Sequence, residues 1–303
     1  IIGIRPKRLA LSLYKELITD ETWAYQRDNY GYRNLRSHPL LVSFLGVPFI
    51  DVRISFNSFI PKNLDDKIST KLVNHYLDEL SKNINYHDKV EFEIIYSCYY
   101  FGIENKLLDL KEFNFNDHDI ESIKKSLLNL TNNIIDVKDG LYKKDLEKIE
   151  ILKEKYNDVV NSDLSLIDKI YWLIKDVKRY GTLPFAGVAR AGFIAVQMVK
   201  SFLDENIIDK EEYDGFLNSL HTVSKKLSID IHNLSKADFL EKYGHLRPGT
   251  YDILSQRYDE AYDMYFNSEQ VKNDEQIELF TFSKIQIEKI EKLITTNGLN
   301  TNF

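Results

Sequence analysis

The chain of 303 residues, with 43% hydrophobic and 29% charged residues, has the composition of a globular protein of one large or two ordinary domains. Its formal net charge of -7 excludes a general nucleic-acid binder, which needs a basic face. One cysteine, Cys98, excludes an internal disulfide framework and a thiolate metal cluster. No apolar stretch approaches the ~20 residues of a membrane span and no signal peptide is visible, so we expect a cytoplasmic protein without membrane contact.

The N-terminal third is expected to combine helices with a small sheet. The chain starts at Ile1 within IIGIRP, which reads as the middle of a longer or processed chain. Leu9, Leu13 and Leu17 have helical spacing, and Thr19 or Asp20 is expected to cap a second helix.

Two stretches of this third alternate as β-strands do. Residues 40–61 form two apolar runs around Gly46 and Pro48, which predicts a hairpin whose second run continues through DVRISFN, residues 51–57. Residues 89–101, KVEFEIIYSCYYF, predict another strand. Residues 65–83 between them predict an amphipathic helix.

Almost everything after residue 116 reads as helix. Helices are expected near 117–133, 141–160, 164–180 and 282–295, and Ser235 with Asp238 resembles a capping box for a helix that stops at Gly244. The predicted fold is therefore α+β, mainly a helical bundle with a small antiparallel sheet. Residues 1–115 would carry the N-terminal helices and the sheet, and residues 116–303 the helical part of the same domain, ending in a polar tail.

The two predicted strands suggest a polar binding site. If they share a sheet, their alternation places one set of polar side chains on the face away from the core. A zwitterionic amino acid needs a cation for its carboxylate and an anion for its ammonium, and the planar fork of arginine suits the first task. The alternative is a solvated sheet face with cross-strand ion pairs. The residues concerned are Asp51, Arg53, Asn57, Glu91 and Glu93.

A third candidate is Arg190 in GTLPFAGVARAGF. It is the single charge among the small residues Gly187, Ala189, Ala191 and Gly192, which permit close approach of another helix or of a ligand. An arginine there should be partly desolvated and should need an anionic partner. It is either a structural ion pair inside the bundle or a clamp for phosphate or carboxylate.

The polar stretch YGHLRPGTYDI, residues 243–253, is the fourth candidate. His245 can exchange protons near neutral pH, and Arg247 can balance phosphoryl charge. Pro248 and Gly249 predict a tight turn that holds these side chains, with Asp252 to orient them. The alternative is a helix connector whose polar groups satisfy one another.

Several other signals are weak or missing. The Ser37–His38 pair lacks a glycine-rich lead-in, and the aromatic and basic residues around it fit an ordinary helix end and loop. The remaining histidines have no metal-ligand spacing, so no metal site is expected. The sequence contains neither GxxxxGK[ST] nor GxGxxG, and therefore no nucleotide-binding motif of these kinds.

Two long stretches resemble known enzymes. PFAGVARAGFIAVQ followed by YGHLRPGTYDILSQRYDE is similar to the middle region of enzymes related to phosphoenolpyruvate synthase and rifampin phosphotransferase. SLYKELITDETWAYQRDNYGYRNLRSHPLLVSFLGVPFIDVRISFNSF resembles the bacterial glutamine kinases, and the likeness runs over roughly residues 1–265.

The resemblance implies part of a three-domain phosphotransferase. In that family an ATP-grasp domain, which uses ATP and Mg²⁺, phosphorylates a histidine on a swivelling domain. The swivelling domain then carries the phosphoryl group to an acceptor, here L-glutamine and its amide nitrogen, for phosphoramidate decoration of capsular polysaccharide. This sequence lacks the ATP-grasp signature and the glycine-rich Ser-His motif, so it is expected to be the acceptor-binding middle domain, without turnover of its own.

Roles within that domain follow from chemistry and not from the family. Phosphoryl transfer depends on positioning and on neutralising oxygen charge, for which Arg190 and Arg247 are the candidates. An amide nitrogen is a poor nucleophile, so His245 is the first choice of base, with Glu93 and Asp252 behind it. Alternatives are a different small-molecule or sugar acceptor, or a non-catalytic module that docks neighbouring domains.

Overall fold

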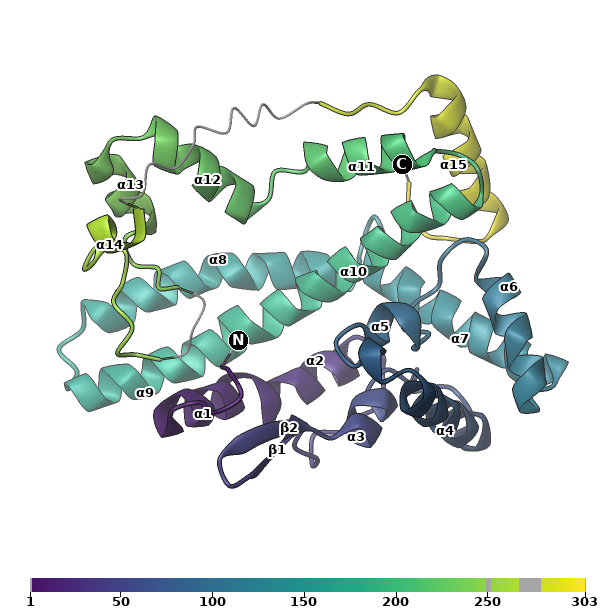
Figure 1. Cartoon of the computed structure of the whole chain (residues 1–303), viewed down its shortest axis with the longest axis horizontal. Coiled ribbons are helices and arrows are strands. Elements are labelled where there is room, and N and C mark those ends of the chain that lie inside the picture. Colours follow the sequence, from purple (N-terminus) through teal and green to yellow (C-terminus); the bar gives the residue numbers. More distant parts are fainter. Residues whose placement is uncertain (1, 249–251, 267–278, 303) are drawn as a thin grey trace.

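The fold is mainly helical with one small antiparallel sheet, which confirms the predicted α+β class (Figure 1). The computed structural model describes residues 2–248, 252–266 and 279–302. The first part of the chain contains α1 (Arg8–Tyr14), the π-helical η1 (Lys15–Thr19), α2 (Thr22–Asn29), β1 (Leu41–Phe44), β2 (Val47–Ile50), α3 (Val52–Asn57), α4 (Asp66–Lys82), η2 (Ile84–Tyr86), α5 (Val90–Glu93), α6 (Ile103–Leu108) and η3 (Asp109–Phe113).

The remainder is helical, as the sequence predicts. It contains α7 (Asp117–Ile135), α8 (Leu141–Val160), α9 (Leu166–Asp176), the π-helical η4 (Val177–Thr182), α10 (Leu183–Asp204), α11 (Lys210–Ser219), α12 (Val223–Asn233), α13 (Lys236–Tyr243), α14 (Tyr262–Phe266) and α15 (Lys284–Thr296). The start of α13 is confirmed in detail, because the Ser235 side chain accepts a hydrogen bond from the Asp238 amide and Gly244 follows the last turn. The expected cap of α2 is wrong: Glu21 precedes this helix, without a side-chain cap.

The hairpin is present but shorter than predicted. β1 and β2 pair from Leu41 opposite Ile50 to Phe44 opposite Val47, and Leu45 and Gly46 both have positive φ in the turn between them. Such a two-residue turn with positive φ matches the twist of a hairpin. The predicted turn at Gly46 is confirmed, but the second strand ends at Ile50 and does not continue through residues 51–57.

The predicted strand over residues 51–57 is wrong, because this segment is α3. The side chain of Asp51 accepts a hydrogen bond from the amide of Ile54 at 3.0 Å, which caps the helix and ends the strand before it. Val52 and Phe56 are four residues apart, a spacing that also places them on one helical face. The pattern of residues 51–57 is thus compatible with a strand and with a helix, and the cap formed by Asp51 favours the helix.

The predicted strand over residues 89–101 is also wrong. Residues 90–93 form the single turn α5, and residues 94–101 follow without a strand, although most of them are buried. Side chains replace a sheet partner here: the amide of Tyr99 donates to the Thr131 hydroxyl at 2.8 Å, and the carbonyl of Ser97 accepts from the Tyr32 hydroxyl at 2.7 Å. These two contacts satisfy part of the buried backbone of this segment, as burial requires.

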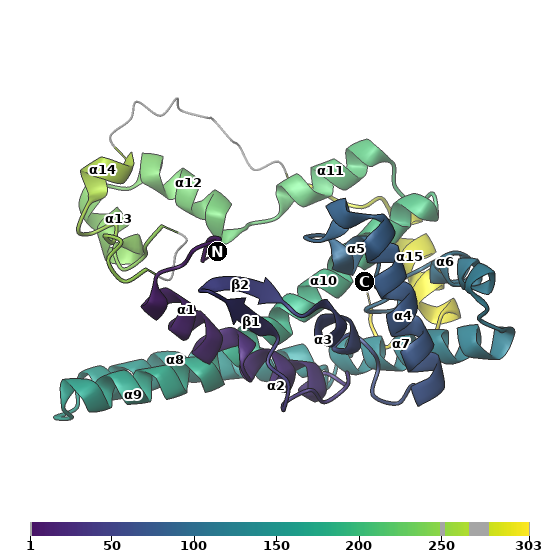
Figure 2. The same cartoon turned by 60° about the horizontal axis from the view of Figure 1, so that its bottom comes forward.

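The longest helical run passes through the middle of the molecule. α9, η4 and α10 continue one another, and α10 packs on α8, α2 and α7, with α12–α14 toward one end of the molecule and α4–α7 toward the other (Figures 1 and 2). One hydrophobic core joins residues from Tyr30 to Leu299. The run Leu166–Asp204 is also long and apolar enough to cross a membrane by length and composition, which the sequence reading did not expect.

Small residues let α10 approach its neighbours closely, as its sequence suggests. The hydroxyl of Tyr30, the residue that follows α2, donates a hydrogen bond to the buried carboxylate of Asp145 of α8 at 2.7 Å. Both groups lie directly against Gly187, where an added Cβ would stand 2.0 Å from Asp145 Oδ2 and 2.4 Å from the Tyr30 hydroxyl. Gly187 is therefore the point at which three helices meet.

Candidate functional site

The polar residues of α3 lie in a half-exposed surface network. Asp51 is engaged as the helix cap, and exposed Arg53 donates to the side chain of Asn74 at 3.2 Å. The Asn57 side-chain oxygen accepts from Arg33 at 3.0 Å. Because the strands that were expected to align these residues do not exist, Asp51, Arg53 and Asn57 do not share a sheet face with Glu91 and Glu93.

Two of the predicted residues do meet, by another route. Arg190 of α10 is 3% exposed and donates from Nη1 to Oε1 of Glu91 in α5. Glu91 keeps 16% of its side chain exposed, so this carboxylate lies at the edge of the buried region. Glu93, two residues on, is exposed and does not join the pair.

Arg27 of α2, which was not among the predicted site residues, is a third charged residue beside Arg190 and Glu91. Its guanidinium carbon lies 4.2 Å from the ring centre of Phe59 and 5.6 Å from that of Tyr32. The guanidinium carbon of Arg190 lies 5.2 Å and 5.8 Å from the same two rings. Two arginines from different helices thus share one aromatic platform, and cation–π attraction helps to hold both.

The charges of this cluster do not balance. Arg190 has Glu91 as its partner, and although burial alone would lower the pKa of Arg190, Tyr32 and Glu91 raise it above the ordinary value. Burial, and then the nearby charge of Arg190, lower the pKa of Arg27 to about 9. Nη1 of Arg27 donates only to a neutral acceptor in the described structure, the side-chain oxygen of Gln26 at 3.3 Å. The cluster therefore contains two cations and one carboxylate, and it is only partly exposed to solvent.

The cluster also holds unsatisfied donors. Nε of Arg190 and the side-chain nitrogen of Gln26 are buried and have no hydrogen-bond partner within the described part of the chain. A buried donor without a partner costs on the order of 1–3 kcal/mol. Surplus positive charge together with free buried donors is the chemistry of a site for an anion.

We expect Arg27→Met to raise the stability of the unliganded chain near neutral pH. The folded state lowers the pKa of Arg27 from its ordinary value to about 9, chiefly through burial, so folding disfavours the charged form. This cost is fully present below about pH 9 and falls as the pH rises above it, because the unfolded chain then binds more protons than the folded chain. Urea unfolding of both proteins should show an advantage of about 1 kcal/mol for the variant at about pH 7 that shrinks above about pH 9. If the difference in unfolding free energy between the two proteins does not change with pH, the charge of Arg27 is not the cause of the difference.

The loop after α13 uses its polar groups internally. Arg247 donates from Nη1 to the carbonyl oxygen of Ile253 at 2.7 Å and also to that of Ser255, which closes the loop. Asp252 forms an ion pair of 2.7 Å with Lys7, and this contact lowers the pKa of Asp252. His245 is exposed. Among the predicted turn residues, Gly249 lies outside the described residues.

The structure therefore separates the predicted site residues. The loop follows α13, which lies near α14 at one end of the molecule, whereas α5 and its contact with α10 lie toward the other, and both views agree on this (Figures 1 and 2). Arg190 and Glu91 form one group with Arg27, while Arg247, His245 and Asp252 belong to the loop. A chemical step that involves both groups would need a change of conformation.

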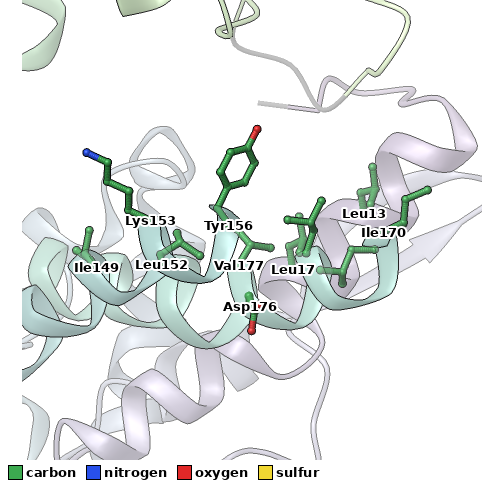
Figure 3. A pocket seen from close by; sticks show the side chains of 11 residues that line it. Leu13, Leu17, Ile149, Leu152, Lys153, Tyr156, Ile170, Asp176 and Val177 are labelled. Atoms are coloured by element: carbon green, nitrogen blue, oxygen red, sulfur yellow. The ribbon is translucent and has the colours of Figure 1, made fainter. Parts of the chain in front are cut away.

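The chain also has a groove of about 650 Å³ lined by α1, η1, α8, α9 and the start of η4. Its lining is apolar apart from Lys153, Asp176 and the hydroxyl of Tyr156. Figure 3 shows Leu13 and Ile170 together at one end of the groove. An apolar lining suits an apolar ligand or segment and gives little to hold a zwitterion. We therefore place the candidate site for a polar ligand at the arginine pair.

Within residues 2–248, 252–266 and 279–302, no three histidine, cysteine or acidic side chains gather as metal ligands would. Burial raises the pKa of the Cys98 thiol to about 12, which leaves it un-ionised and unreactive.

Comparison of the chain with protein-family models, with curated proteins and with solved structures found no match.

Proposed function

We propose that this chain is the L-glutamine-binding middle domain of an ATP-dependent glutamine kinase. The sequence resemblance supplies the acceptor and the reaction. One observation carries the proposal: Arg190 is almost completely buried beside Glu91, with the extra cation of Arg27 on the same aromatic platform. An amino acid offers a carboxylate and an ammonium group, and this cluster offers the complementary charges.

In this proposal the chain binds the acceptor and other domains deliver the phosphoryl group. ATP and Mg²⁺ bind to an ATP-grasp domain, and a phosphohistidine on a swivelling domain approaches the acceptor. The enzyme acts in the cytoplasm, with no nucleic acid or membrane as partner, and the amide nitrogen is phosphorylated for capsular phosphoramidate. His245 is exposed in the loop after α13, away from the arginine pair, so its role as proton acceptor requires a change of conformation that brings the loop and the acceptor together.

Calorimetry with L-glutamine tests the proposal directly. We expect binding of L-glutamine at millimolar concentration by the folded chain, and weaker binding of L-glutamate and L-asparagine. A folded chain that gives no heat of binding with L-glutamine would rule out the acceptor assignment. Preference for another amino acid would redirect it to a related phosphotransferase with a different acceptor.

A docking module is the second candidate, and a specific surface favours it. α9 exposes Leu166 and Ile167, each at 79%, together with Trp172 at 48%. Exposed apolar residues this close together mark surfaces for other proteins or domains. If the chain binds no amino acid but associates with an ATP-grasp or swivelling domain, and Ile167→Glu abolishes that association, docking is its function.

A further inference from the structure

The two arginines differ in burial and in their partners, and this difference suggests how a ligand would bind. Arg190 is deeply buried and already engaged by Glu91, whereas Arg27 is half-buried and lacks a carboxylate partner among the described residues. Glu91 is partly exposed. Within the cluster, Glu91 is therefore the charged group at the edge of the buried region, and Arg27 is the cation without a carboxylate partner among the described residues.

We propose that Arg27 and Arg190 form a clamp for the α-carboxylate of an amino acid, and that Glu91 receives its ammonium group. The idea rests on the proposed function for the identity of the ligand and adds the residues that select it. Gln26 supports the clamp, because its buried side-chain nitrogen is a further free donor beside Arg27.

The aromatic platform explains why this clamp can exist without its ligand. The rings of Tyr32 and Phe59 lie against both guanidinium groups, and Phe193 adds a third contact to Arg190 at 5.3 Å. Tyr32 itself is fixed by its hydrogen bond to the carbonyl of Ser97. A stacked guanidinium is held in one plane, so little orientation is lost when a carboxylate binds.

The low pKa of Arg27 fits the same account. A bound carboxylate would place a negative charge beside Arg27, and an opposite charge at such a distance favours the protonated form. Arg190 of α10, Glu91 of α5 and Tyr32 are the groups whose charges act on Arg27, and Glu91 is the acid among them. The ligand would thus supply the counter-charge that Arg27 lacks.

The experiment measures binding to the wild-type chain and to three variants by calorimetry. The probes are L-glutamine, glutamine α-amide without the carboxylate, glutaramate without the ammonium group, and inorganic phosphate. Arg27→Met should weaken L-glutamine binding at least about tenfold and Arg27→Lys less, because lysine keeps the charge but not the fork. Arg36→Met is the matched control, since Arg36 also stacks on a tyrosine, at 4.2 Å from the ring of Tyr25, but has its own partner in Asp28. It should bind L-glutamine as the wild type does.

The probes separate failure of the clamp from failure of the acceptor. Glutamine α-amide should bind the wild type and Arg27→Met equally weakly, because it has no carboxylate for Arg27 to hold. If L-glutamine binds both proteins equally well, the clamp is wrong while the proposed function stands. If L-glutamine does not bind, but glutaramate or phosphate binds in an Arg27-dependent way, the arginine pair is an anion site, and both the amino-acid ligand and the role of Glu91 are wrong.

Discussion

The Gly187→Ala variant is expected to lose about 3 kcal/mol of unfolding free energy or more. An added methyl group would stand 2.0 Å from Asp145 Oδ2 and 2.7 Å from the ring carbon that carries the Tyr30 hydroxyl. Neither neighbour can move freely, because Asp145 is buried and also forms an ion pair of 2.9 Å with Lys148. Relief of the overlap would therefore open the junction of α2, α8 and α10.

Gly192 in the same helix is the matched control. An added Cβ there meets nothing within 4 Å, and the position is exposed. Gly192→Ala should raise the free energy of unfolding by about 0.5–1 kcal/mol, because alanine restricts the unfolded chain more and favours the helix. Urea unfolding of both variants gives the comparison. Equal effects of the two substitutions would show that helix propensity, and not the three-helix junction, decides stability in α10.

The sequence predicted helices well where several signals coincide. Ser235 before Asp238, followed by an apolar stripe and then Gly244, marks both ends of α13, and the structure has these ends. α4 and α7 are also found close to their predicted bounds. In these segments the cap, the periodicity and the stop are all local, so the sequence carries the whole signal.

The strand errors arose because a strand depends on a partner elsewhere in the chain. Alternation in DVRISFN is compatible with a strand, yet the described part of the chain places no strand to pair with it, and the Asp51 side chain offers the Ile54 amide a local hydrogen bond. Residues 94–101 are apolar because they are buried, and hydroxyls of Thr131 and Tyr76 supply contacts that a strand would have supplied. A single sequence does not reveal these distant donors and acceptors.

The candidate site was predictable in part. Arg190 stood out because it is the one charge in the apolar, small-residue segment 181–193, and its need for an anion follows from burial alone. Its partner Glu91 was among the named residues, but for a different reason. Arg27 was missed because WAYQRDNY looks like an ordinary polar helix end. Only the packing of α2 on α10 brings its guanidinium over the rings that Arg190 also contacts.

The second large effect is expected at Arg190. Arg190→Met should lower the free energy of unfolding by about 3 kcal/mol, because it removes one partner of a buried ion pair and leaves the carboxylate of Glu91 without it. Glu91 keeps some exposure and Arg27 lies nearby, so the loss should fall at the lower end of the range for such pairs. Urea unfolding near neutral pH measures it.

The double variant Arg190→Met with Glu91→Leu decides whether the charge or the packing matters. If the unpaired carboxylate causes the loss, the double variant should recover about 2 kcal/mol relative to Arg190→Met alone, because apolar groups replace both charges. Recovery should remain incomplete, since Arg27 then faces no carboxylate at all, and adding Arg27→Met should restore more of the stability. If the double variant is no more stable than Arg190→Met, the guanidinium of Arg190 stabilises the fold through its contacts with the rings of Tyr32, Phe59 and Phe193. The cluster is then held together by aromatic packing and not by the ion pair.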